Sequence, residues 1–248
     1  MDIVYIIGGK TDCDWWDLRC SLRSLKMFGK GVDRVIVAGE TPSWLSDDVE
    51  KWKFEQPYPS PSGFKEKHRN LQETLRFIAS HENCPEEFIV GFSDVFLTQT
   101  VDFDSYPFYA KLTSSNGIDL PKSPSTDYNK SLVSTRCFLQ EHDLPTRYTT
   151  MHRFIRIKKS DVLGCGELFD EINEKDLSVE PFVLVGNWGI KNSGIKTIPV
   201  KDYKISRGDE WWKSNPGITD CFSVRHLYYG PLLILLQSLY QNKCDYEG

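Results

Sequence analysis

The segment Phe88-Ile-Val-Gly-Phe-Ser-Asp-Val-Phe-Leu97 places one acidic residue, Asp94, between two apolar runs. The run before Asp94 is typical of a buried strand, so we expect the carboxylate where that strand ends. A charge in such a place is unfavourable unless a cation or several hydrogen-bond donors meet it. A divalent metal that carries a substrate diphosphate is one solution. A turn cap or an ion pair with an arginine is the ordinary alternative.

Two helices are expected to present groups that hold phosphate. Arg19 and Arg23 lie one turn apart in the helix expected over about 15–28, so both guanidiniums can grip one diphosphate. Lys67 and Asn70 share a face at the start of the helix expected over about 65–80, where free N–H groups attract anions. A solvated basic face and an ordinary polar helix entry are the simpler interpretations of the two pairs.

Residues 147–159 form the most basic segment of the chain, with no acid between Asp143 and Asp161. Cations for phosphates and aromatic rings for bases are what a nucleic-acid contact needs, and a basic surface strand is the alternative. The candidate acceptor-binding residues in this segment are Arg147, Tyr148, Arg153 and Arg156.

Three further polar residues are candidates for the site, two as general bases and one as a contact to the sugar. His152 lies within the basic segment, and Asp202 follows a strand expected over 196–200, so either can serve as a general base. A hydrogen-bonded structural histidine is the commoner role of a lone His. Asn187 lies in an expected polar turn flanked by aromatic residues, where it can contact a sugar.

The elements that must position these residues alternate between strands and helices. Ile3-Val-Tyr-Ile-Ile7 is typical of a central strand, and Gly8-Gly9 allows the backbone to pass close to a ligand. After the first helix, Val35-Ile-Val-Ala38 predicts a second strand parallel to the first. Ligands of open α/β sheets bind beyond the carboxyl ends of the strands. Ile7, Gly8, Gly9 and Asp94 are therefore expected to meet in one crevice.

The second half of the chain has weaker patterns. Residues 113–130 are rich in Ser, Asn, Asp and Pro, which favours a loop that acts as a lid. Helices are expected near 131–140 and 160–173, short strands near 182–186 and 196–200, and a last helix after Pro231. No repeat or long linker divides the chain, so the sequence predicts a single α/β domain.

Composition limits the class of protein. The 248 residues are 40% hydrophobic and 26% charged, and the net charge of −5 provides no general attraction to DNA or to anionic membranes. The seven cysteines include no C-x-x-C pair, and the chain begins directly in a strand, so we expect a reduced, cytoplasmic compartment. The longest apolar run, Leu232–Leu236, is too short for a membrane span. G-x-S-x-G, Walker and H-E-x-x-H motifs are absent, which argues against hydrolase and NTPase chemistry.

Several motifs together resemble a known group of proteins. They are Asp2-Ile-Val-Tyr5, Asp17-Leu-Arg-Cys-Ser-Leu-Arg-Ser-Leu25, Pro42-Ser-Trp-Leu45, Lys67-His-Arg-Asn70 and the strand before Asp94. This set is similar to the nucleotide-sugar transferases of tailed phages and to the Stealth family of capsular sugar-phosphate transferases. The resemblance is clear over residues 2–97. Beyond them, His152, Asn187 and Asp202 match later polar positions of those families.

The resemblance implies a GT-A-like, Rossmann-type mixed sheet with helices on both faces. Residues 1–112 would bind the nucleotide-sugar, and residues 113–248 would bind the acceptor. The families have an Asn-Asp-Asp segment for a Mn²⁺ or Mg²⁺ ion, whereas this chain has Phe92 and Ser93 at the first two positions. Only Asp94 is retained as a metal ligand, so the cationic side chains are an alternative way to neutralise the leaving group.

The leading functional expectation is a glycosyltransferase that moves a sugar from a nucleotide-sugar, with UDP as the expected nucleotide, to a hydroxyl group. The favoured acceptor is hydroxymethylcytosine in phage DNA, which places the protein in the host bacterial cytoplasm. One alternative is a cytoplasmic transferase, glycosyl or sugar-phosphate, for capsular or cell-surface polysaccharide. Another is a non-catalytic protein that binds nucleotide-sugar or DNA.

Overall fold

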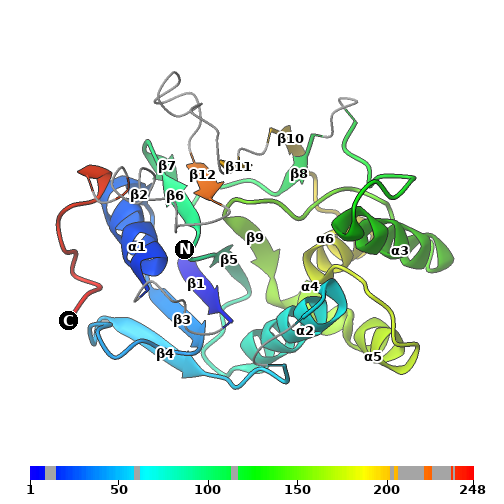
Figure 1. Ribbon diagram of the computed structural model, residues 1–248, viewed down its shortest axis with the longest axis horizontal. Coiled ribbons are helices and arrows are strands. Elements are labelled where there is room, and N and C mark those ends of the chain that lie inside the picture. The colour runs from blue at the N-terminus through cyan, green and yellow to red at the C-terminus, as the bar shows by residue number, and fades with distance from the viewer. Residues whose placement is uncertain are drawn as a thin grey trace.

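A five-stranded mixed sheet forms the centre of the molecule (Figure 1). The structure, a computed structural model, describes residues 1–8, 15–58, 62–112, 117–201, 204–205, 221–224, 236 and 238–248. β1 pairs in parallel with β3 and β5, and β9 joins β5 in the antiparallel sense. In spatial order the strands are β4 (Val49–Lys53), β3 (Val35–Gly39), β1 (Asp2–Ile7), β5 (Glu87–Gly91) and β9 (Ile155–Lys158).

Helices and smaller strands surround this sheet. The helices are α1 (Trp16–Phe28), α2 (Phe64–Ser80), α3 (Asp127–Glu141), α4 (Lys159–Gly164), α5 (Gly166–Glu174) and α6 (Pro181–Asn192). The short strands are β2 (Gly29–Lys30) with β7 (Val101–Asp102), β8 (Tyr109–Lys111) with β10 (Ile198–Val200), and β11 (Lys204–Ile205) with β12 (Cys221–Val224) and β6 (Val95–Leu97).

The central strands are buried on both faces because successive side chains point to opposite sides. Along β1, Ile3, Tyr5 and Ile7 pack with α1, whereas Val4 and Ile6 pack in the core that includes α2. Figure 1 shows α1 and α2 on opposite sides of the sheet. The predicted fold class, a single α/β domain with a Rossmann-like mixed sheet and helices on both faces, is confirmed.

The structure overturns one prediction of secondary structure and divides one expected helix in two. The apolar stretch expected as a strand over 182–186 belongs to helix α6, which begins with Pro181 and has Glu180 at its N-cap. Proline is well suited to the first turn of a helix, since that position needs no N–H donor. The helix expected near 160–173 is two helices, α4 and α5, divided at Cys165. The helix expected after Pro231 falls mostly outside the described residues.

The loop expected over 113–130 is shorter than predicted. Helix α3 begins at Asp127, and the side chain of its N-cap residue, Thr126, accepts a hydrogen bond from the backbone N–H of Asn129. Residues 117–126 precede it and are bonded to the segment that follows α3, since the backbone N–H of Leu120 donates to the carbonyl of Thr146 at 2.8 Å. Residues 113–116 lie outside the described part of the chain.

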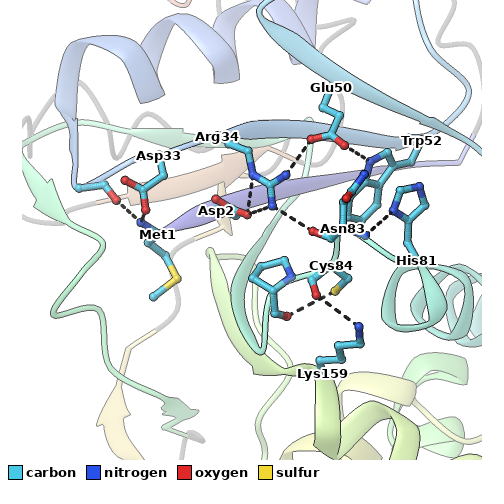
Figure 2. Close-up of polar contacts among 12 residues, drawn as sticks. Met1, Asp2, Asp33, Arg34, Glu50, Trp52, His81, Asn83, Cys84 and Lys159 are labelled. Carbon is cyan, nitrogen blue, oxygen red and sulfur yellow. Dashed lines mark hydrogen bonds and ion pairs between the residues drawn. The ribbon is translucent and has the colours of Figure 1, made fainter.

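The amino ends of the strands are joined by polar contacts (Figure 2). Arg34, just before β3, donates to Asp2 in β1 at 2.9 Å and to Glu50 in β4 at 3.0 Å. The same guanidinium also reaches the carbonyl of Asn83 ahead of β5 at 3.0 Å. One side chain thus connects four neighbouring segments at the amino ends of the strands. These contacts leave the carboxyl ends of the strands, including that of β5, open to a ligand.

The C-terminal residues are fixed to α1 by a buried carboxylate. Glu247 accepts hydrogen bonds from Arg23 at 2.7 and 2.9 Å and from Arg19 at 2.8 Å. Burial by itself would raise the pKa of Glu247, but the bonds from Arg23 and Arg19 outweigh it and hold that pKa below its ordinary value. Arg19 also lies over the Trp44 ring, 3.9 Å from the centroid. Figure 1 shows the C-terminal segment beside α1.

We predict that Glu247→Ala strongly destabilises the fold. Removing the carboxylate leaves Arg23, whose side chain is only 8% exposed, as a buried charge without its partner. Loss of one partner of a buried pair typically lowers the free energy of unfolding by about 3–5 kcal/mol. Urea denaturation measures this change. The control is Asp245→Ala, which removes an exposed ion pair with Lys26 and should change stability by at most about 1 kcal/mol. Equal effects of the two variants would contradict the role given to Glu247.

Candidate functional site

A pocket of about 260 Å³ lies beyond the carboxyl end of β5. It brings together Asp94 and His152, two predicted catalytic residues that are 58 positions apart in the chain. The lining residues come from α2, the β5–β6 turn, the end of β8, α3, the 148–152 segment and the start of α6. They are Leu71, Phe92, Asp94, Lys111, Tyr128, Tyr148, Thr150, Met151, His152, Glu180 and Phe182.

Asp94 reaches the pocket because the chain turns sharply after β5. The backbone N–H of Val95 donates to the carbonyl of Phe92 at 3.2 Å, which closes the turn around Ser93 and Asp94. Ser21 of α1 donates to the carbonyl of Val95 at 2.5 Å from within the core. Ser93 donates to the buried carboxylate of Asp17 at 2.8 Å, so the turn is held on its α1 side as well. These contacts leave Asp94 half-buried on the pocket wall.

The segment that carries Tyr148 and His152 is held by a buried amide. Asn187 of α6 accepts from the backbone N–H of Arg147 and donates to the carbonyl of the same residue, both at 2.8 Å. The carbonyl of Tyr148 accepts a hydrogen bond from the backbone N–H of Lys111, and the backbone N–H of Tyr148 donates to the carbonyl of Ile118, both at 2.7 Å. Asn187 lies fully buried within helix α6 and not in the predicted polar turn, so it positions the pocket wall and does not face a donor sugar.

Glu180 is a pocket residue that sequence reasoning missed. One of its carboxylate oxygens accepts from the backbone N–H of Val183 at 2.7 Å, as an N-cap of α6. Burial raises the pKa of Glu180 to about 7, although bonds from Val183, Thr150 and Phe182 oppose that shift. An acid followed by proline and an apolar run is a helix-start signal. That signal would have placed Glu180 at the start of a helix instead of before a strand.

The chemistry of the pocket suits a polyhydroxylated ligand that reacts by proton transfer. Phe92 and Phe182 pack edge to face with centroids 5.5 Å apart, and they provide an apolar wall. Asp94 and Glu180 supply hydrogen-bond acceptors for hydroxyl groups, and His152 supplies an imidazole that can accept or donate a proton. The Lys111 ammonium lies 5.2 Å from the Tyr148 ring and brings one positive charge.

Several residues predicted to bind the donor have other contacts in the structure. Arg19 and Arg23 hold Glu247, so we leave both out of the proposed site. Asn70 is buried, and its amide accepts from the N–H of Tyr58 at 2.9 Å and donates to its carbonyl at 2.6 Å, which fixes the chain before α2. Lys67 is exposed at the start of α2.

The end of β1 lies at the same edge of the sheet as the β5–β6 turn, as predicted. Ile7 is buried, whereas Gly8 is exposed, and a Cβ atom at Gly8 would lie 3.3 Å from the Gln56 side chain. Two predicted site residues, Gly9 and Asp202, fall outside the described residues. Neither Ile7 nor Gly8 is among the residues that line the pocket with Asp94, so the described residues do not bring the end of β1 and Asp94 together in one crevice.

The basic segment 147–159 is compensated by acids from elsewhere in the chain. Arg147 pairs with Asp119 at 3.0 Å, and Arg156 donates to Glu87 at 3.0 Å. Arg153 is buried at 2% exposure, with its guanidinium 4.9 Å from the centroid of the Tyr109 ring. These contacts differ from the solvent-facing cationic strip that a DNA backbone would require. The sequence pattern did not indicate these ion pairs, because the acidic partners are distant from the segment in the sequence.

The resemblance implies a metal site at Asp94. In the part of the chain that the structure describes, no group of three or more His, Cys, Asp or Glu side chains is placed to hold a metal ion. The residues present do not make the carboxylate pair that the resemblance implies.

Comparison with known proteins adds no assignment: no family model and no curated protein matches this chain. The resemblance to the Stealth and phage transferase families stays a prediction. The described helices include none with the length and hydropathy needed to cross a membrane.

We predict that Glu180 makes stability fall as pH rises. The folded protein holds the Glu180 proton up to a pKa of about 7, whereas the unfolded chain releases it near 4.5. The folded state therefore binds more protons between these values, and its free energy of unfolding decreases as pH rises through that window. Glu180→Gln removes this contribution and retains an N-cap side chain.

Thermal melts of both proteins from pH 4 to pH 8.5 measure the effect. The wild type should lose stability relative to Glu180→Gln between about pH 4.5 and 7, and the difference should be constant above that range. Parallel pH profiles of the two proteins would show that Glu180 ionises with an ordinary pKa.

Proposed function

We propose that the protein is a glycosyltransferase that moves a sugar from a nucleotide-sugar to a hydroxyl acceptor. The observation that carries this proposal is the meeting of Asp94, His152 and Glu180 in one aromatic-lined pocket at the carboxyl end of a central strand. Open α/β sheets bind nucleotide ligands at this end of their strands. The absence of hydrolase and NTPase motifs agrees with this class of reaction.

The proposed reaction is a displacement at the anomeric carbon of the donor sugar. The acceptor oxygen forms the new bond to that carbon, and the bond to the diphosphate oxygen breaks. The acceptor proton goes to Glu180, whose pKa of about 7 suits a general base at neutral pH, with His152 as the second candidate. Asp94 accepts hydrogen bonds from hydroxyl groups of the donor sugar, and Lys111 offers positive charge to the departing diphosphate.

The structure bears on the choice of acceptor. The sequence favoured hydroxymethylcytosine in DNA as the acceptor because residues 147–159 are basic. In the structure, however, Asp119 and Glu87 neutralise two arginines of that segment. A saccharide hydroxyl requires no cationic strip, so this pairing favours the alternative of a surface-polysaccharide acceptor. Salt distinguishes the two, because the affinity for DNA falls steeply with ionic strength and the affinity for a neutral saccharide does not.

Donor binding gives the direct test, and we expect one UDP-sugar to raise the melting temperature of the wild-type protein. Ligands that bind only the folded state stabilise it by about 2.7 kcal/mol at a hundred times their dissociation constant. A thermal-shift screen of UDP-, GDP- and CMP-sugars is run with Mn²⁺ and with EDTA, since Asp94 was a predicted metal ligand. A screen in which no nucleotide-sugar shifts the melting temperature would contradict the proposal.

Sugar transfer from the donor that the screen identifies is then measured for the wild type, for Asp94→Asn and for Asp48→Asn, an exposed acid outside the pocket. We expect Asp94→Asn to reduce sugar transfer by about a hundredfold or more, because a carboxylate that meets the reacting sugar is lost. Asp48→Asn should retain wild-type transfer. Donor binding without transfer in the wild type would identify the non-catalytic binding protein instead.

Glu180 should determine the pH dependence of transfer. As the base it must be ionised, so kcat/KM should rise with pH and level off above a pKa of about 7. Glu180→Gln should lower kcat by about 10²–10⁴-fold, and its kcat/KM should no longer rise with pH through that pKa. Steady-state rates from pH 5 to pH 9 measure both effects. If the rise persists in Glu180→Gln and disappears in His152→Gln, His152 is the base.

A further inference from the structure

An aromatic and cationic surface adjoins the candidate pocket. It consists of Phe64 and Lys67 of α2 and Tyr128 of α3, and we call it the α2–α3 platform. Tyr128 lines the pocket, and its ring centroid lies 5.3 Å from that of Phe64. Leu71, another pocket residue, is two helical turns after Phe64 and therefore lies on the same face of α2. The platform is thus continuous with the pocket wall.

Phe64 is unusual among the described residues in its exposure. It is 37% exposed, and the other large hydrophobic side chains that are exposed, Met27, Leu163, Ile198 and Leu239, carry no aromatic ring. An aromatic ring partly exposed to solvent beside a pocket can pack against the C–H face of a sugar ring and exclude water from both. The position of Phe64 beside the pocket suits the sugar unit next to the one that reacts.

Lys67 differs from its neighbours on α2 in its ionic contacts. Lys65 and Arg69 both pair with Asp176, at 2.7 and 2.6 Å. Among the described residues the Lys67 ammonium has no acidic partner, and it lies 5.5 Å from the centroid of the Phe64 ring. A ligand ring on Phe64 would therefore meet a positive charge that no carboxylate of the described residues neutralises.

We propose that the α2–α3 platform binds the adjacent sugar of an oligosaccharide acceptor, and that this sugar carries a carboxylate or phosphate group. The inference rests on the proposed function and names its acceptor class. Phe64 and Tyr128 provide the apolar contact, and Lys67 pairs with the anionic group. Single-stranded DNA also offers rings and negative charge, but it needs a row of cations along its backbone. In this region Lys65 and Arg69 are already neutralised, which favours the oligosaccharide.

Calorimetric titrations of the full chain test the platform with three probes: a hexasaccharide with a glucuronate in every second unit, neutral maltohexaose, and a single-stranded thymidine oligonucleotide. The proteins are wild type, Lys67→Ala, Phe64→Ala, and the control Lys65→Ala. Thermal melts establish that each variant is folded. Titration with UDP in parallel reports the donor half of the site.

We expect the wild type to bind the glucuronate probe about fivefold or more tightly than maltohexaose, a difference of about 1 kcal/mol. Lys67→Ala should remove this preference, Phe64→Ala should weaken both saccharides about fivefold, and Lys65→Ala should change neither. UDP affinity should be the same in all four proteins.

Three outcomes would overturn the platform as an acceptor subsite. They are equal behaviour of Lys67→Ala and Lys65→Ala, tightest binding of the oligonucleotide, and loss of UDP affinity in Lys67→Ala, which would assign the lysine to the donor. Failure of the proposed function looks different. In that case UDP and the nucleotide-sugars fail to bind the wild type, whereas the saccharide preference and its dependence on Lys67 remain.

Discussion

The candidate site depends on how β5 ends. A strand buried on both faces must leave the core through a turn whose backbone groups find partners, because unpaired buried groups are strongly unfavourable. Here Ser21 of α1 and the phenol of Tyr5, 3.0 Å apart, lie beneath that turn, and Ser21 donates to the carbonyl of Val95. The helix that packs on the sheet thereby also fixes the direction of the chain at Asp94.

The opposite wall of the pocket depends on a second polar contact in the core. Asn187 satisfies both backbone groups of Arg147 and also donates to the carbonyl of Val183 within its own helix, at 2.7 Å. A fully buried amide with all these partners is rigid. The same helix begins at Glu180, so α6 positions one pocket residue directly and holds the segment that carries His152. The catalytic candidates are thus held by core packing rather than by a mobile loop.

The sequence predicted the three central strands, β3, β1 and β5, because they are continuous apolar runs, a pattern that burial on both faces imposes. Asp94 was found for the same reason, since a lone acid after such a run marks a strand end. The outer strands β4 and β9 alternate charged and apolar residues, so their pattern is weaker. Asn187 and Glu180 were harder, because the residues between them are as apolar as a strand and only Pro181 identifies the helix. The partners of Arg19, Arg23 and Arg156 were beyond sequence reasoning, because Glu247 and Glu87 come from distant parts of the chain.

Charge compensation separates the basic residues that support the fold from those that can bind a ligand. A guanidinium held by a buried carboxylate, as Arg23 is by Glu247, must break that pair before it can hold a phosphate, and breaking it leaves a buried charge. Lys111 lies in the pocket wall, and Lys67 lies at the edge of the pocket on an exposed part of α2. Both lie beside an aromatic ring, so each can meet an anion where apolar surface is also covered. The proposed site therefore uses these two lysines, and the arginines that dominate the sequence pattern belong to the scaffold.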